Sequence, residues 1–209
     1  MNFLQLCQRL RQETGISDSG PSNVTGQVGD MKRLVDWVQE AWVRIQSERN
    51  DWGWMWQRKT ATLPSGAQTF DLGSSVGRLV SGTVYVNDRL LREISYQDMR
   101  KAQKVVSARM PSFYAKRPDG IYEMDTTVDG DSAIEYECYS RPAPFVEAID
   151  VPAIPDQYHM MIVWLALIDY ALFDEAPELY QKAKVNYDKL MAELAVEQMP
   201  EVVMPGAIA

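Results

Sequence analysis

The segment DMKRLVDWVQEAWVRIQSERN, residues 30–50, determines how the rest of this chain has to be arranged. Its apolar residues recur at alternating spacings of three and four, which is the period of a helix with one buried stripe. Asp30 is a suitable N-cap for this helix. The stripe consists of Met31, Leu34, Val38, Ala41 and Ile45, and Trp37 and Trp42 widen its flanks. A helix of this kind needs an apolar partner.

The best partners lie near the other end of the chain. Residues 155–173, PDQYHMMIVWLALIDYALF, are almost wholly apolar, and residues 177–198 repeat the three-four spacing. Residues 2–14 predict a further short helix that ends at Gly15. We therefore predict an α+β fold, mainly α, in which residues 1–56 and 151–198 form an antiparallel helical bundle. Its predicted core comprises Met31, Leu34, Trp37, Val38, Ala41, Trp42, Ile45, Trp164, Leu165, Ile168, Tyr187 and Leu190.

Residues 57–150 predict an antiparallel β module inserted between the two halves of the bundle. From residue 58 the apolar period becomes two, which is typical of strands. Turn-forming residues separate three predicted hairpins, namely 58–63 with 68–72, 79–86 with 89–94, and 112–116 with 121–124. Residues 133–139 predict another strand, and residues 95–106 a short helix capped by Ser95. The prolines and small apolar residues of 199–209 predict a C-terminal arm outside both parts.

Composition narrows the class of protein. The chain has 209 residues, 46% of them hydrophobic, and a net charge of −8 spread along the sequence, which argues against sequence-specific binding to duplex DNA. Cys7 and Cys138 lie far apart, which favours buried thiols in a reducing compartment over a disulfide. The N-terminal residues lack a signal-peptide pattern, and residues 160–173 are too few to span a membrane. We expect a soluble intracellular protein.

Residues with catalytic potential are sparse, and we expect neither an enzyme nor a cofactor or metal site. The single histidine, His159, begins an apolar helix without a nucleophile motif beside it. The metal-binding, nucleotide-binding and dinucleotide-binding motifs are missing from the sequence. The acid pairs Asp174–Glu175 and Glu135/Glu137 are interpreted more simply as helix-terminal charge and as the solvent face of a strand.

Five tryptophans permit two interpretations. They are Trp37, Trp42, Trp52, Trp54 and Trp56. Aromatic packing inside the protein is the simpler interpretation, while stacking on sugars or single-stranded nucleic acid is the alternative and requires several exposed indoles. A short basic run, Arg100, Lys101, Lys104 and Arg109, is interpreted as a solvated helix face, with a weak nucleic-acid backbone contact as the alternative.

Several stretches together resemble the head-to-tail adaptor proteins of tailed bacteriophages. In chain order they are FLQLCQRLRQETGI (3–16), GPSNVTGQ (20–27), RLVDWVQEAWVRIQ (33–46), TLPSGAQTFDL (62–72), PSFYAKRPDGIYEM (111–124), YECYSRP (136–142), IPDQYHMMIVWLALIDYALF (154–173) and YQKAKVNYDKLMAEL (180–194). Each is a pattern of apolar, aromatic and turn residues, and residues 74–106 match least clearly.

The resemblance implies a virion structural protein at the head-tail junction, present in the host cytoplasm during assembly. It implies a ring, commonly of twelve copies, that docks beneath the portal ring, continues the DNA channel and gives a tail or nozzle protein its platform. DNA would pass without sequence-specific binding. A tail-completion or stopper protein is the alternative in the same class. The arm residues Val202, Val203, Met204, Pro205 and Ile208 are candidate contacts with the portal or a neighbouring copy.

Overall fold

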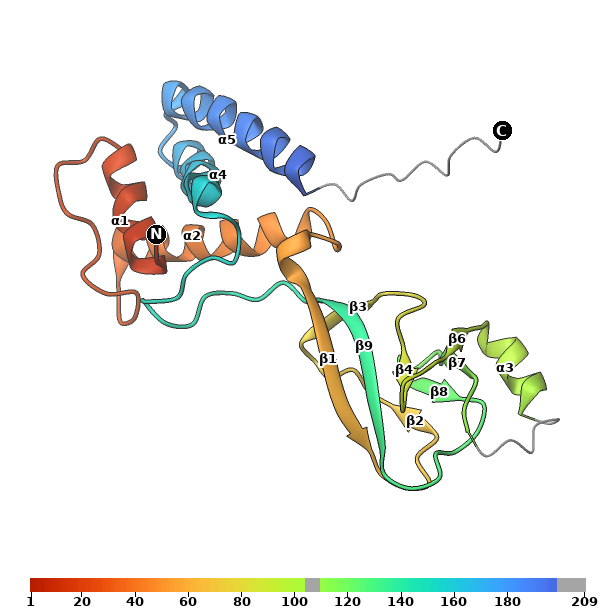
Figure 1. Cartoon of the computed structure of the whole chain (residues 1–209). Coiled ribbons are helices and arrows are strands. Elements are labelled where there is room, and N and C mark those ends of the chain that lie inside the picture. Colours follow the sequence, from red (N-terminus) through yellow and green to blue (C-terminus); the bar gives the residue numbers. More distant parts are fainter. Residues whose placement is uncertain (104–109, 199–209) are drawn as a thin grey trace, which may run out of the picture. The chain divides into compact units, whose positions relative to one another are not determined.

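A computed structural model describes residues 1–103 and 110–198 of the chain (Figure 1). Its helices and two sheets make a mixed α+β fold, as predicted. By its internal contacts the chain divides into two compact units. The helical unit combines Met1–Trp54 with Pro142–Ala209, and the β unit comprises Met55–Arg141. Residues 142–150 therefore group with the helices.

The helical unit is organised around α4 (His159–Phe173). This helix packs against α1 (Phe3–Glu13), α2 (Gly29–Ser47) and α5 (Pro177–Glu197), and one-turn 3-10 helices span Gly53–Met55 and Asp156–Tyr158 (Figure 1). An α-helix that is apolar on all sides is stable in water only where other elements cover it. Most α4 side chains are accordingly buried, and this burial explains why the helix contains almost no charged residues.

The start of α1 has a side-chain cap, whereas the start of α2 has none among the described residues. Asn2 caps α1 because its side chain accepts from Gln5 N at 2.9 Å, while the Gln5 side chain accepts from Asn2 N at 2.9 Å. The prediction that Asp30 is the N-cap of α2 is wrong. The N-cap is Val28, two residues earlier, so the helix begins at Gly29 and Asp30 instead adds negative charge to its first turn.

The predicted core residues fall into two groups by exposure. Eight are buried: Leu34, Val38, Ala41, Trp42, Ile45, Leu165, Ile168 and Tyr187. The other four are only partly buried: Met31, Trp37, Trp164 and Leu190. Trp37 packs edge-on against Tyr170, with ring centroids 5.8 Å apart, and the ammonium of Lys182 lies over the Trp164 ring at 5.4 Å. These indoles cover the rim of the helical core rather than its centre.

The β unit consists of two sheets that share one hydrophobic core. The larger has the order β1-β9-β4-β5, with β3 also pairing with β9, and the smaller has the order β2-β8-β7-β6. Side chains from both sheets meet in the core, including Tyr114, Met124 and Ile134, and Leu91 joins them from the connection between β5 and β6. The strands are β1 (Trp56–Leu63), β2 (Thr69–Phe70), β3 (Val76–Leu79), β4 (Tyr85–Val86), β5 (Arg89–Leu90), β6 (Arg92–Glu93), β7 (Phe113–Lys116), β8 (Tyr122–Met124) and β9 (Ser132–Ser140).

The predicted hairpin of residues 58–63 with 68–72 is wrong. The turn exists, since Gly66 has φ 81° and Ala67 N donates to Pro64 O at 3.0 Å. The two strands nevertheless enter different sheets, because β1 pairs with β9 along its whole length and β2 pairs with β8. Alternation in a sequence specifies which face of a strand is buried, but it does not specify the partner strand.

The other local β predictions are closer to the structure. β4 and β5 form a hairpin through Asn87 and Asp88, both with positive φ, and β7 pairs with β8 around residues 117–120. Ser95 caps α3 (Tyr96–Ala102), and β9 alternates buried and partly exposed residues as predicted. The module is not purely antiparallel, however, because β6 pairs with β7 in parallel across the α3 crossover.

Candidate assembly surfaces

Residues 142–155 connect β9 to α4, and the helical unit holds them at several points. Gln46 makes two hydrogen bonds to Ala143, donating from Nε2 to its carbonyl at 2.9 Å and accepting from its amide at 3.1 Å. The Phe145 ring stacks between Phe3 and Trp42, with centroids 4.7 and 5.5 Å away. These paired backbone groups and the buried Phe145 ring give the segment a fixed conformation, although it is neither helix nor strand.

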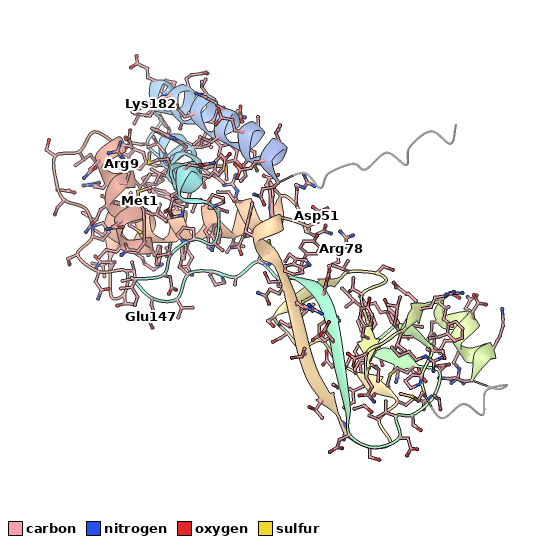
Figure 2. The ribbon with its side chains drawn as sticks, in the orientation of Figure 1. Met1, Arg9, Asp51, Arg78, Glu147 and Lys182 are labelled. Carbon is pink, nitrogen blue, oxygen red and sulfur yellow. The ribbon has the colours of Figure 1, made fainter. Side chains whose placement is uncertain are left out.

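The turn within this segment is stabilised by one carboxylate. Asp150 accepts hydrogen bonds from Val146 N at 2.7 Å and Glu147 N at 2.8 Å, and these bonds lower the pKa of that carboxyl. Its own carbonyl accepts from Phe3 N at 2.8 Å, which attaches the turn to α1. Glu147, labelled in Figure 2, lies at the turn.

The same turn presents aliphatic side chains to solvent. Val146 is 72% exposed, Ile149 is 77% exposed and Val151 is 61% exposed. Burying such side chains in a protein interface stabilises it in proportion to the apolar area removed from water. Sequence analysis missed this surface and assigned residues 142–150 to the β module. The available signal was the alternation of prolines with Val and Ile between residues 142 and 155.

A second fixed surface segment follows α1. Arg11 is almost fully buried and forms two hydrogen bonds with the Asp18 carboxylate, from Nε at 2.8 Å and from Nη2 at 2.6 Å. The bonds from Arg11, followed by one from Gly20 N, lower the pKa of Asp18 to about 2. The loop that the sequence predicted is therefore anchored to α1 by the Arg11–Asp18 ion pair. Gly20, which has φ 72°, lies directly beside Arg11.

The five clustered tryptophans are mostly covered. Trp42 and Trp52 are buried, Trp37 and Trp54 are partly buried, and Trp56 is 44% exposed. Trp52 and Trp54 stack on each other at 4.5 Å, and Trp52 Nε1 donates to Ile45 O at 3.0 Å. This arrangement fits aromatic packing and provides no row of exposed indoles for sugars or bases.

His159 is buried at the start of α4. Its Nδ1 lies 2.6 Å from the Met1 amino nitrogen, and its Nε2 lies 3.2 Å from the Ile154 carbonyl oxygen. An ammonium donates to Nδ1, so the neutral imidazole donates from Nε2 to the carbonyl. Burial, followed by the Met1 positive charge, lowers the pKa of His159. These contacts are structural ones between α1, α4 and the segment before α4.

The predicted acid pairs also have structural partners. Arg58 forms an ion pair with Glu135, and Trp56 Nε1 donates to Glu137 at 3.3 Å. Asp174 accepts from the Tyr170 hydroxyl at 3.1 Å. Within residues 1–103 and 110–198, no group of three or more His, Cys, Asp or Glu side chains is placed to hold a metal ion.

The remaining predicted positions lie partly outside the described residues. Arg100 and Lys101 are exposed on α3, whereas Lys104 and Arg109 are not described. The arm residues Val202, Val203, Met204, Pro205 and Ile208 likewise lie outside the described residues. Cys7 and Cys138 are free and buried, and burial raises the pKa of the Cys7 thiol to about 12.

In the described part of the chain, the segment after β9 presents exposed aliphatic side chains. The charged and polar groups of Arg11, Glu135, His159 and Asp174 have partners within the protein. The family model described as SU10 adaptor protein matches residues 1–206, so the chain belongs to that family of phage structural adaptors. It is a component of the virion and associates with other virion proteins. A search of curated proteins finds no match. None of the helices in the described part of the chain is long and apolar enough to cross a membrane.

Proposed function

We propose that this chain is a ring-forming head-to-tail adaptor. Copies of it, commonly twelve, dock beneath the portal ring, continue its DNA channel and provide the platform on which the tail or nozzle protein attaches. The observation that carries the proposal is the family match, which extends over residues 1–206 and therefore includes both units and most of the arm. In this role the chain uses neither a cofactor nor a catalytic residue.

The charge of the chain suits a DNA channel. With a net charge of −8, a ring of copies would repel the phosphate backbone on average and let the genome slide rather than adhere. Local basic groups such as Arg58 and Arg11 are neutralised by carboxylate partners. The proposal therefore includes DNA passage without sequence-specific binding.

Two surfaces are the proposed protein contacts. The first is the fixed turn with Val146, Ile149 and Val151, whose aliphatic side chains lose their contact with water once a partner covers them. The second is the arm, in which Val202, Val203, Met204, Pro205 and Ile208 gain burial only when another surface receives them. The arm is proposed to contact the portal or a neighbouring copy.

The test is assembly with purified components. Light scattering and negative-stain microscopy should show a stoichiometric complex when the protein is mixed with the portal ring of the same phage, with rings present either before or after mixing. Deleting residues 199–209 should weaken docking while the far-UV circular dichroism spectrum stays unchanged. A protein that ignores the portal, but binds a portal already loaded with another adaptor, would instead be a stopper or tail-completion protein.

A further inference from the structure

The first strand of the β unit leaves one edge open among the described residues. β1 has eight residues, pairs with β9 on one side only, and ends the strand order of its sheet. Seven of its eight side chains are exposed or partly exposed. An edge strand of this length presents unpaired amides and carbonyls that another extended segment can join.

The two cations on this strand do not guard the edge. Arg58 pairs with Glu135 on β9, including a bond from Nε at 2.8 Å, and Lys59 Nζ donates to Ser75 Oγ at 2.9 Å. Ser75 precedes β3, which pairs with the opposite side of β9. Arg58 therefore reaches onto β9, and Lys59 reaches across it. Both side chains lie away from the open edge, although charged residues on edge strands commonly prevent pairing with other chains.

The rest of the strand favours pairing. Trp56, Thr60 and Thr62 share one face, since they lie opposite Tyr139, Glu135 and Ala133 of β9. Aromatic and β-branched residues are those that pack best on a pleated surface. All three are exposed, so a strand added beside β1 would find side-chain contacts as well as backbone partners.

The chain itself contains a segment of matching chemistry. Residues 201–204, Glu-Val-Val-Met, lie between Pro200 and Pro205. The valines favour an extended conformation, and each proline lacks the amide needed to continue a strand ladder, so pairing is limited to these four residues.

We propose that residues 201–204 of one copy add a strand to the open edge of β1 in a second copy. The arm of each copy would engage the next, a heterologous contact that closes into a ring when the rotation allows it. This inference deepens the proposed ring and rests on it. It identifies β1 as the receiving surface between copies and assigns the arm to the neighbour rather than to the portal.

Disulfide trapping between full-length chains tests the contact. One chain has Thr60→Cys, and a second has Val202→Cys, Val203→Cys or Met204→Cys, because opposed residues in paired strands meet the distance that a disulfide requires. Cys7 and Cys138 are fully buried and do not compete. Mild oxidation of the mixture, with portal and without it, should give a cross-linked dimer for at least one arm position.

Matched controls distinguish a specific strand contact from random collision of the thiols. Replacing Thr60→Cys by Gln181→Cys, which is exposed on α5, should lower the dimer yield about tenfold because the thiols then meet only by collision. Adding Val202→Pro to the Val203→Cys or Met204→Cys arm should abolish trapping, whereas Val202→Thr should preserve it. A disulfide within one chain in the Thr60→Cys/Val203→Cys double variant, with no mixed dimer, would overturn the proposal.

Portal binding is measured in the same samples, so the two proposals fail separately. Portal binding without any trapped dimer would overturn the arm exchange and leave the adaptor function intact. A trapped dimer without portal binding would support the exchange and contradict docking beneath the portal. Efficient dimers of the Thr60→Cys chain alone would show that β1 pairs with β1 and would also overturn the proposal.

Discussion

At the scale of single residues, Tyr187 has an unusual hydroxyl. Its Oη is buried without a hydrogen-bond partner in the described part of the chain, and burial raises the pKa of the phenol to about 12. Tyr187→Phe should therefore leave the protein as stable as before or stabilise it by about 1 kcal/mol, because an unsatisfied buried group is removed. Tyr158→Phe is the control, since that hydroxyl donates to Glu197 at 2.5 Å. The control should lose about 1–2 kcal/mol in urea unfolding; equal losses in both variants would contradict the prediction.

His159 should make stability depend on pH. Its folded pKa lies below the ordinary 6.5, so the unfolded chain binds a proton more readily than the folded one. The free energy of unfolding should therefore be highest above pH 6.5 and should decrease as the pH falls below that value. His159→Gln, which keeps a donor and an acceptor but does not titrate, should show a flatter profile from about pH 7 to about pH 5. Parallel profiles in denaturant titrations would refute this assignment.

At the scale of elements, the segment that follows β9 depends on Gln46. Gln46→Ala removes both hydrogen bonds to Ala143. It should lower the free energy of unfolding by about 1–3 kcal/mol and make hydrogen exchange at the Ala143 amide faster. Gln39→Ala is the matched control, because Gln39 makes one bond at 3.2 Å to Phe145 O. It should cost less and leave exchange at Ala143 unchanged. Equal exchange in the two variants would show that Gln46 does not fix the segment.

The capping box of α1 gives a second prediction for an element. Asn2→Ala removes the acceptor for Gln5 N, and the start of the helix should lose about 1 kcal/mol. Asn2→Ser retains an oxygen acceptor and should restore most of the loss. Thermal unfolding followed by circular dichroism measures both. A Ser variant no more stable than the Ala variant would exclude the cap as the cause.

At the scale of the whole molecule, the β unit has its own core and nearly adjacent ends. Trp56 and Tyr139 are register partners close to its boundaries at Met55 and Arg141. We expect a fragment of residues 55–141 to fold alone, with a dispersed NMR spectrum and a cooperative unfolding transition. The predicted boundary at residue 150 would add a segment whose contacts lie in the helical unit. A collapsed, poorly dispersed fragment would show that the unit depends on the helices.

The sequence was sufficient for features that depend on local chemistry. The three-four stripe of residues 30–50 predicted α2, the apolar run predicted α4, and Asn87–Asp88 and residues 117–120 predicted turns that the structure contains. The resemblance to phage adaptors also came from the order of such segments, and the family match supports it. Each of these signals lies within a short window, where spacing and turn residues decide the conformation.

The tertiary structure alone decided which distant segments meet. It paired β1 with β9 rather than β2, placed β6 parallel to β7, and fixed the turn of Val146, Ile149 and Val151 in the helical unit. A strand sequence specifies a buried face but leaves its partner open, and a proline-rich segment specifies neither. The open edge of β1 follows from that long-range choice, because only the complete strand order shows which strand lies at the end of the sheet.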